Sequence, residues 1–215
     1  YTLVRQLCDE GYATLVHSNH SQNLCDHYIG RRKVRKNVMG FKHTLAELDE
    51  LEETYRKDII EWLDTRPLGV SYTLNNGKHY HIAHAYHDRN LDYTNPSLLS
   101  PDEVNRTLRG IKTSWLYQGK KYSKHIGFWR NPKKRGAVDN HVLCAGHWEQ
   151  VIVTDNCVVN DPGGHETNGR IGVYNALQND ITIYEKKKDK NVIKLIDDSC
   201  RHHCQIDQHL NAALF

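Results

Sequence analysis

Three short polar segments of the sequence each lie at the C-terminal end of an apolar run that is typical of a buried strand. The segments are Asn19-His20 after residues 13–16, His84 after residues 81–83, and Gly146-His147 after residues 142–145. In open α/β sheets, ligands bind beyond the carboxyl ends of the strands. Amide oxygens and imidazole nitrogens suit borderline divalent cations such as manganese, iron, nickel and zinc. The three segments together therefore indicate a metal-binding edge of an α/β sheet.

Short apolar runs separated by turn residues predict the strands that would position these segments. Tyr12–Val16 is rich in strand-forming residues, and we expect it to be a buried strand. Val70–Leu74 and His79–Ala83 flank Asn75-Asn76-Gly77, which predicts a β-hairpin. Further short strands are predicted over residues 141–145, 150–154, 158–160, 170–174 and 180–184.

The helices are predicted from apolar periodicity and from residues that favour helix ends. Residues 1–10 are expected to be helical. A longer helix is expected to begin at Thr44, because Thr44 and Glu47 have the spacing of a capping box, and to end at Pro67. Ser100-Pro101 predicts the start of another helix.

Residues 115–140 are basic and show no clear period, so we expect a long loop. Lysine and arginine alternate there with Tyr122, Phe128 and Trp129, and a second basic cluster covers residues 31–36. Basic side chains beside aromatic rings are typical of sites that bind nucleotides or single-stranded nucleic acid. A solvated charged loop is the alternative explanation.

The composition limits the class of protein. The chain has 215 residues with 29 basic and 26 acidic side chains, a net charge of +3. This length suits one domain with a sizeable core, and the near balance of charge argues against one surface that wraps a polyanion. No apolar run is long enough to predict a membrane span. The six cysteines are mostly scattered singly, which favours reduced thiols in the cytoplasm.

The order of the motifs resembles that of the metallophosphoesterases, the calcineurin-like phosphoesterase superfamily. It is most similar to the bacterial branch that contains polynucleotide kinase–phosphatase and dinucleoside-tetraphosphatase enzymes. The segments that carry the resemblance are Ser18–Ser21, Gly30-Arg31, Thr44–Leu48, Arg66–Leu68, Ile82–Ala85, Gly146–Trp148 and Val159–Gly163. They correspond in order to the family's Gly-Asn-His-Asp, Gly-Arg, Thr-Leu-Ala-Glu-Leu, Leu-Pro, Val-Ala-His-Ala, Gly-His-Thr and Asn-Ile-Asp-Thr-Gly segments.

The resemblance covers residues 1–184 and implies an α/β fold, a calcineurin-like α/β/β/α sandwich of two mixed sheets whose N-terminal part is missing. Residues 185–215 would be a charged C-terminal extension. The family site holds two divalent metal ions, with manganese as the foremost expectation and iron, nickel or zinc as alternatives. Asn19, His84 and His147 would bind the second metal, and His20 would face the phosphate that is cleaved. The family hydrolyses phosphate esters with a metal-activated water, so the substrate would be a phosphoprotein, a nucleotide or a nucleic-acid end.

The sequence also departs from the family pattern. The family's Asp-x-His and Gly-Asp-x-x-Asp-Arg segments, which supply the first metal's ligands, do not occur ahead of Tyr1, and residues 1–5 read like the interior of a helix. We therefore expect this chain to begin partway through such a domain and to hold only the second-metal half of the site. Ser18 replaces a glycine at a tight turn, and Ser21 replaces the acid that follows the family's histidine.

Two other functions stay open at this point. A catalytically inactive phosphoesterase homologue would keep the fold and bind nucleic acid or a protein partner through its basic segments. A zinc-binding module would use Cys200 and Cys204 with the histidines beside them, although their spacing matches no strong zinc pattern. The sequence does not predict an oligomeric state.

Overall fold

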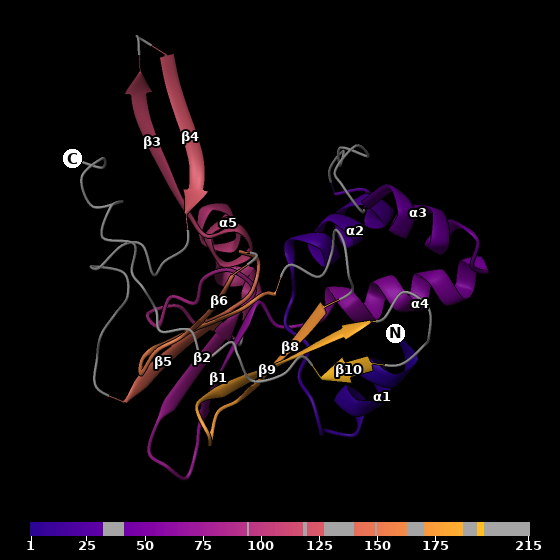
Figure 1. The fold of residues 1–215 in the computed structure, drawn as a ribbon. Helices are drawn as coiled ribbons and strands as arrows, with labels where there is room; N and C mark the ends of the chain where they lie inside the picture. Colours follow the sequence, from indigo (N-terminus) through magenta and orange to yellow (C-terminus); the bar gives the residue numbers. More distant parts are fainter. Residues whose placement is uncertain are drawn as a thin grey trace.

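The computed structural model describes residues 1–31, 41–93, 95–117, 120–126, 140–148, 150–162, 170–186 and 193–195. These residues form a mixed α/β fold with a five-stranded sheet, a three-stranded sheet and a two-stranded hairpin (Figure 1). No helix in the described part of the chain combines the length and the apolar composition that crossing a bilayer requires.

The five-stranded sheet has the order β1-β2-β5-β7-β6. Its strands are β1 (Gly69–Thr73), β2 (His79–Ala83), β5 (His141–Ala145), β6 (Val151–Val153) and β7 (Cys157–Asn160). The three central strands, β2, β5 and β7, run parallel, whereas β1 and β6 pair antiparallel with their neighbours at the two edges. The carboxyl ends of the central strands therefore meet at one edge of the sheet.

Alternate side chains of the central strands build the core on the two faces of this sheet. On one face Val142 packs with Tyr80 and Val158, and on the other face Leu143 packs with Val159. The three-stranded sheet is made of β8 (Arg170–Asn175), β9 (Asp180–Lys186) and β10 (Ile193–Leu195). Tyr174 and Ile181 from this sheet, and Ala176 from the turn between β8 and β9, pack against the first face. The Tyr80 hydroxyl donates a hydrogen bond to the Ala176 carbonyl at 2.9 Å.

The helices lie beside the sheets, and the fifth lies apart from the others, at the base of the two-stranded hairpin (Figure 1). They are α1 (Thr2–Asp9), α2 (Asn19–Ile29), α3 (Phe41–Asp49), α4 (Glu53–Asp64) and α5 (Pro101–Arg109), with a short 3-10 helix, η1, over Pro96–Leu98. A core made of Leu24, Cys25, Phe41, Leu45 and Ile60 joins α2, α3 and α4. The packing of these helices fixes the start of α2 relative to the end of α4.

The hairpin after Val70 and the helix after Ser100 are confirmed. β1 and β2 pair antiparallel, and Gly77 between them has φ 78°, a conformation that glycine adopts without strain. In α5 the Ser100 side chain accepts a hydrogen bond from the Glu103 N–H, and the Glu103 side chain accepts one from the Ser100 N–H. The five strands predicted between residues 141 and 184 are also present.

The prediction of a buried strand over Tyr12–Val16 is wrong. This segment has no regular secondary structure, and Tyr12 is 79% exposed. Among the described residues, β1 pairs only with β2. The Tyr72 hydroxyl of β1 donates a hydrogen bond to Thr14 Oγ1 of the segment at 2.7 Å. An apolar segment becomes a strand of a sheet only when another strand pairs with it. The composition of the segment does not show whether such a partner strand exists.

The single helix expected from Thr44 is two helices. α3 begins at Phe41, so Thr44 lies inside it, and the chain leaves the helical conformation before Glu53. Glu52 is extended, with φ −55° and ψ 139°. The break lets α3 and α4 pack separately onto α2, and this tertiary packing outweighs the continuous apolar periodicity of the sequence.

The loop expected over residues 115–140 is a β-hairpin in its first part. β3 (Ile111–Tyr117) and β4 (Lys120–Ile126) pair antiparallel, and the hairpin projects beyond α5 (Figure 1). β-branched and aromatic residues in β3 explain the strand. Residues 127–139 lie outside the described part of the chain, as do residues 32–40 of the other basic cluster. Of the predicted extension, the described residues are 185–186 and 193–195, where β9 ends and β10 pairs with it.

Candidate metal centre

The candidate site lies at the carboxyl ends of the parallel strands. His84 directly follows β2, and Gly146-His147 directly follows β5. The Gly146 N–H donates a hydrogen bond to the His84 carbonyl at 2.9 Å, which joins the two strand ends. The indole N–H of Trp148 donates to the Ala85 carbonyl at 3.2 Å. These contacts hold the two histidine-bearing turns beside each other.

His147 has a left-handed backbone, with φ 70°. Residues other than glycine adopt this conformation uncommonly, although asparagine, aspartate and histidine do so more often than the rest, and it costs on the order of 1–3 kcal/mol. The turn after β5 therefore holds this imidazole in a position that the local sequence does not favour. Strained residues of this kind cluster at functional sites.

Asn19 reaches the site from the first turn of α2. Ser18 caps this helix: its side chain accepts a hydrogen bond from the Ser21 N–H at 3.0 Å, and Ser21 Oγ accepts one from the Ser18 N–H at 2.8 Å. Ser18 has φ −109°, an extended conformation that does not require glycine. Ser18 and Ser21 thus form a capping box, which fixes where α2 begins.

The structure brings together the three side chains predicted as ligands. His84 Nε2 lies 2.8 Å from Asn19 Oδ1 and 3.0 Å from His147 Nδ1. Ligand atoms about 2.1 Å from an ion and at right angles to each other are about 3.0 Å apart, the spacing of an octahedral shell. An amide oxygen and two imidazole nitrogens that face one another are held together by a shared proton or by a cation. Their separations and their chemistry fit a divalent cation.

Burial, together with the interactions with His147 and His20, lowers the pKa of His84 from its ordinary value of 6.5 to about 3. Arg109 acts in the same direction, whereas the carboxylate of Asp161 raises this pKa. His84 is therefore neutral over the physiological pH range, and a neutral imidazole is the form that binds a metal.

Two basic residues outside the predicted ligand set, His20 and Arg109, lie close enough to act on the pKa of His84. His20, predicted to face the phosphate, lies in the first turn of α2 with its side chain exposed, close enough for its charge to act on His84. Arg109 comes from the last turn of α5, and its guanidinium donates to Asn23 Oδ1 at 3.3 Å. Arg109 and Asp161 were not among the predicted site residues, because no local motif shows that they approach His84.

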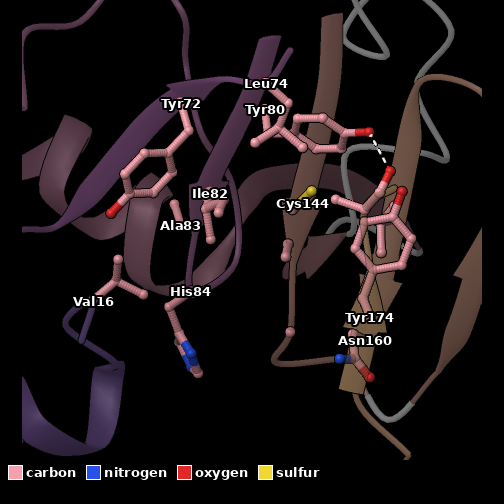
Figure 2. A pocket seen from close by; sticks show the side chains of 14 residues that line it. Val16, Tyr72, Leu74, Tyr80, Ile82, Ala83, His84, Cys144, Asn160 and Tyr174 are labelled. Atoms are coloured by element: carbon pink, nitrogen blue, oxygen red, sulfur yellow. Dashed lines mark hydrogen bonds between the residues drawn. The ribbon is translucent and has the colours of Figure 1, made fainter. Parts of the chain in front are cut away.

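An apolar pocket of about 450 Å³ adjoins the site, between the five-stranded sheet and β8. Figure 2 shows His84 and Asn160 at the same end of this pocket, with Tyr80 and Tyr174 farther in. Asn160 Nδ2 donates a hydrogen bond to the Gly172 carbonyl at 2.8 Å, which links the end of β7 to β8. The pocket offers an apolar surface next to the polar edge.

The predicted zinc module over Cys200 and Cys204 lies outside the described residues, and so do most of the basic side chains expected near the site. No protein-family model and no curated protein matches this sequence. Function is therefore inferred from the residues of the site themselves.

Proposed function

We propose that this chain carries the second-metal half of a phosphoesterase site and that its substrate is a phosphate ester. The observation that carries the proposal is the convergence of Asn19 Oδ1, His84 Nε2 and His147 Nδ1 at the carboxyl ends of β2 and β5. These atoms would bind one divalent cation, manganese foremost. A bound cation supplies Lewis-acid activation of the phosphate and of the attacking water.

The residues around the three ligands suit an anionic substrate. Arg109 brings positive charge to this edge, and the start of α2 adds the positive end of a helix dipole. An arginine guanidinium matches the geometry of phosphate oxygens. His20 would stabilise charge on the phosphate or protonate the leaving group, and Arg109 would orient the phosphate.

The same proposal includes the finer assignments of fold and location. The five-stranded mixed sheet with a second sheet packed on one face is compatible with a calcineurin-like sandwich. The described cysteines, Cys8, Cys25, Cys144 and Cys157, are all free thiols, which supports a reducing compartment such as the cytoplasm.

The test uses a longer version of the chain that carries the family's Asp-x-His and Gly-Asp-x-x-Asp-Arg segments ahead of Tyr1. With manganese, this protein should hydrolyse an aryl phosphate, and His84→Ala should lower kcat/KM by more than about 100-fold because a metal ligand is lost. His79→Ala is the matched control, since His79 lies at the opposite end of the same strand. Full activity in His84→Ala would contradict the proposal.

The inactive homologue predicts a different result. Its ground is the loss of the family's acidic residue at Ser21. The longer protein would then bind nucleic acid in a salt-dependent manner and show no metal-dependent turnover. Measuring both properties on the same preparation separates the two functions.

A further inference from the structure

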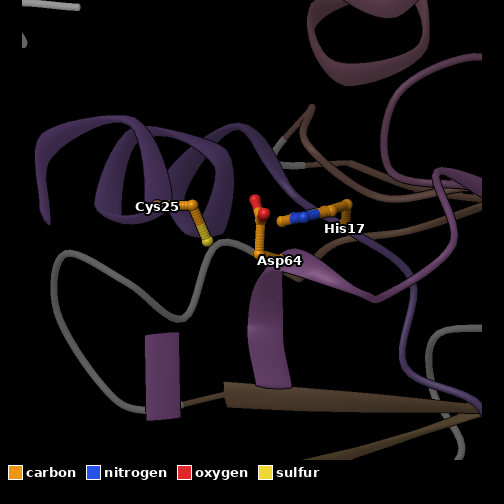
Figure 3. Close-up of side chains that lie close together, drawn as sticks. All are labelled: His17, Cys25 and Asp64. Atoms are coloured by element: carbon orange, nitrogen blue, oxygen red, sulfur yellow. The ribbon is translucent and has the colours of Figure 1, made fainter. Parts of the chain in front are cut away.

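A second group of side chains that can bind a metal lies between α2 and the C-terminal end of α4. His17 precedes the cap of α2, Cys25 lies within α2, and Asp64 is the last residue of α4. One ligand atom from each residue lies within 4.8 Å of the other two. In the view of Figure 3, the Asp64 carboxylate stands between Cys25 Sγ and the His17 ring. None of the three belongs to the cation site at His84.

The hydrogen bonds of His17 leave its second nitrogen available toward this group. His17 Nδ1 lies 2.7 Å from Ser21 Oγ, and Ser21 Oγ donates its hydrogen to the Ser18 carbonyl at 3.1 Å. While its hydrogen points to the Ser18 carbonyl, the serine hydroxyl accepts from the His17 N–H; in that tautomer the proton is on Nδ1 and the lone pair on Nε2. A histidine that binds metal through one nitrogen and donates the other N–H to an oxygen is the usual arrangement in metal sites.

We propose that His17, Cys25 and Asp64 bind a zinc ion through Nε2, Sγ and a carboxylate oxygen, with a water in the fourth position. A thiolate, an imidazole and a carboxylate together are a donor set that zinc accepts. With Zn–S about 2.3 Å and Zn–N about 2.0 Å, tetrahedral ligand atoms lie about 3.4 Å apart. Because the ligand atoms lie within 4.8 Å of one another, the longest separation must shrink by at most about 1.4 Å, which side-chain rotations achieve.

The burial of Cys25 favours a role in binding zinc over a role as a nucleophile. Cys25 is 0% exposed and His17 is 4% exposed. The Cys25 thiol lies 3.8 Å from the Ile60 carbonyl, inside the core that joins α2 to α4. A substrate does not reach this sulfur, whereas an ion needs only the space between the three side chains.

The charged side chains near His17, Cys25 and Asp64 are compatible with a bound divalent cation. Arg31 forms a two-pronged ion pair with Asp64, with Nη1 2.7 Å from Oδ1, and lies 4.0 Å from Asp26. A carboxylate has about four lone-pair positions, so the arginine leaves room for a metal bond. Zinc with the Cys25 thiolate, both aspartates and Arg31 sums to a net charge of zero. The bound ion would tie the start of α2, which carries Asn19 and His20, to the end of α4.

The test measures cobalt binding, because cobalt replaces zinc and its bond to a thiolate gives a charge-transfer band in the near ultraviolet. The full chain is used with Cys200→Ser and Cys204→Ser, so that thiols of the tail do not contribute. We expect one equivalent of cobalt to give the band, and Cys25→Ala to abolish it. Cys157→Ala is the matched control, since Cys157 is 3% exposed and lies in a different core. A band that persists in Cys25→Ala, or no band in the parent protein, would overturn the proposal.

A second pair of variants identifies the carboxylate ligand without touching the core. Asp64→Asn and Arg31→Gln both remove the Arg31–Asp64 ion pair, but only Asp64→Asn removes a ligand. We expect Asp64→Asn to weaken cobalt binding by about 10-fold or more and Arg31→Gln to leave it unchanged or stronger. Equal weakening in the two variants would mean that the ion pair matters and the carboxylate does not bind the metal. This pair decides the question even if Cys25→Ala does not fold.

Discussion

His87 should make the stability of the protein sensitive to acid. Its ring is 4% exposed, and three groups face it: Ser71 Oγ at 3.4 Å from Nε2, the His81 ring at 5.1 Å and the Tyr93 ring at 4.4 Å. Burial, reinforced by the charge of His81, lowers the pKa of His87 from 6.5 to about 4, and the neighbouring Asp88 opposes this shift. Among the described residues, no hydrogen-bond partner reaches its buried Nδ1.

The sign and size of the effect follow from linkage. The unfolded chain binds a proton on this imidazole near pH 6.5, whereas the folded chain binds it near pH 4. Between these values the unfolded state holds more protons, so stability is full above pH 6.5 and is lost as the pH falls toward 4. Integrated from pH 7 to pH 5, this one group lowers the free energy of unfolding by about 2 kcal/mol.

The assay is urea unfolding at pH 7 and pH 5 in the presence of a chelator. His87→Leu should shrink the loss of unfolding free energy between the two pH values by about 2 kcal/mol, whatever its effect at pH 7. His43→Leu, on the exposed side of α3, is the matched control and should leave the loss unchanged. If His87→Leu loses as much stability as the parent protein between pH 7 and pH 5, burial of this imidazole does not govern its proton affinity.

Three further predictions concern the stability of the fold, each measured as the free energy of unfolding in urea. Leu108→Ala should cost about 2–5 kcal/mol because this side chain is 1% exposed, whereas Leu98→Ala, at a residue that is 74% exposed, should stay within about 0.5 kcal/mol. Gly172→Ala should cost about 1–3 kcal/mol, because the added methyl group would collide with the Asn160 side chain; no loss would mean that Asn160 moves freely. Ser100→Ala should cost about 1 kcal/mol through loss of the α5 cap, and a neutral result would show that the cap is redundant.

Local sequence patterns predict much of this fold. The β1–β2 hairpin and the cap of α5 depend on residues within a few positions of each other, such as Gly77 and Ser100. For the same reason, the strand ends that carry His84 and His147 are visible in the sequence. The structure places His84 and His147 beside Asn19, as expected for a metal-binding edge of the sheet. Their role as metal ligands stays a prediction.

Features that depend on distant partners are not visible in this way. Tyr12–Val16 has the composition of a strand, but no described strand pairs with it. The break between α3 and α4 reflects packing against α2, which periodicity within one helix does not report. Arg109 reaches the surroundings of His84, and Asp64 reaches Cys25, only after the helices have docked.

The most direct test of the central claim is anomalous diffraction from crystals of this chain grown with manganese. We expect a manganese peak within coordination distance of Asn19 Oδ1, His84 Nε2 and His147 Nδ1, and we expect crystals of His84→Ala to lack it. Manganese bound elsewhere, with these three side chains still joined only to one another, would contradict the claim that they form a cation site.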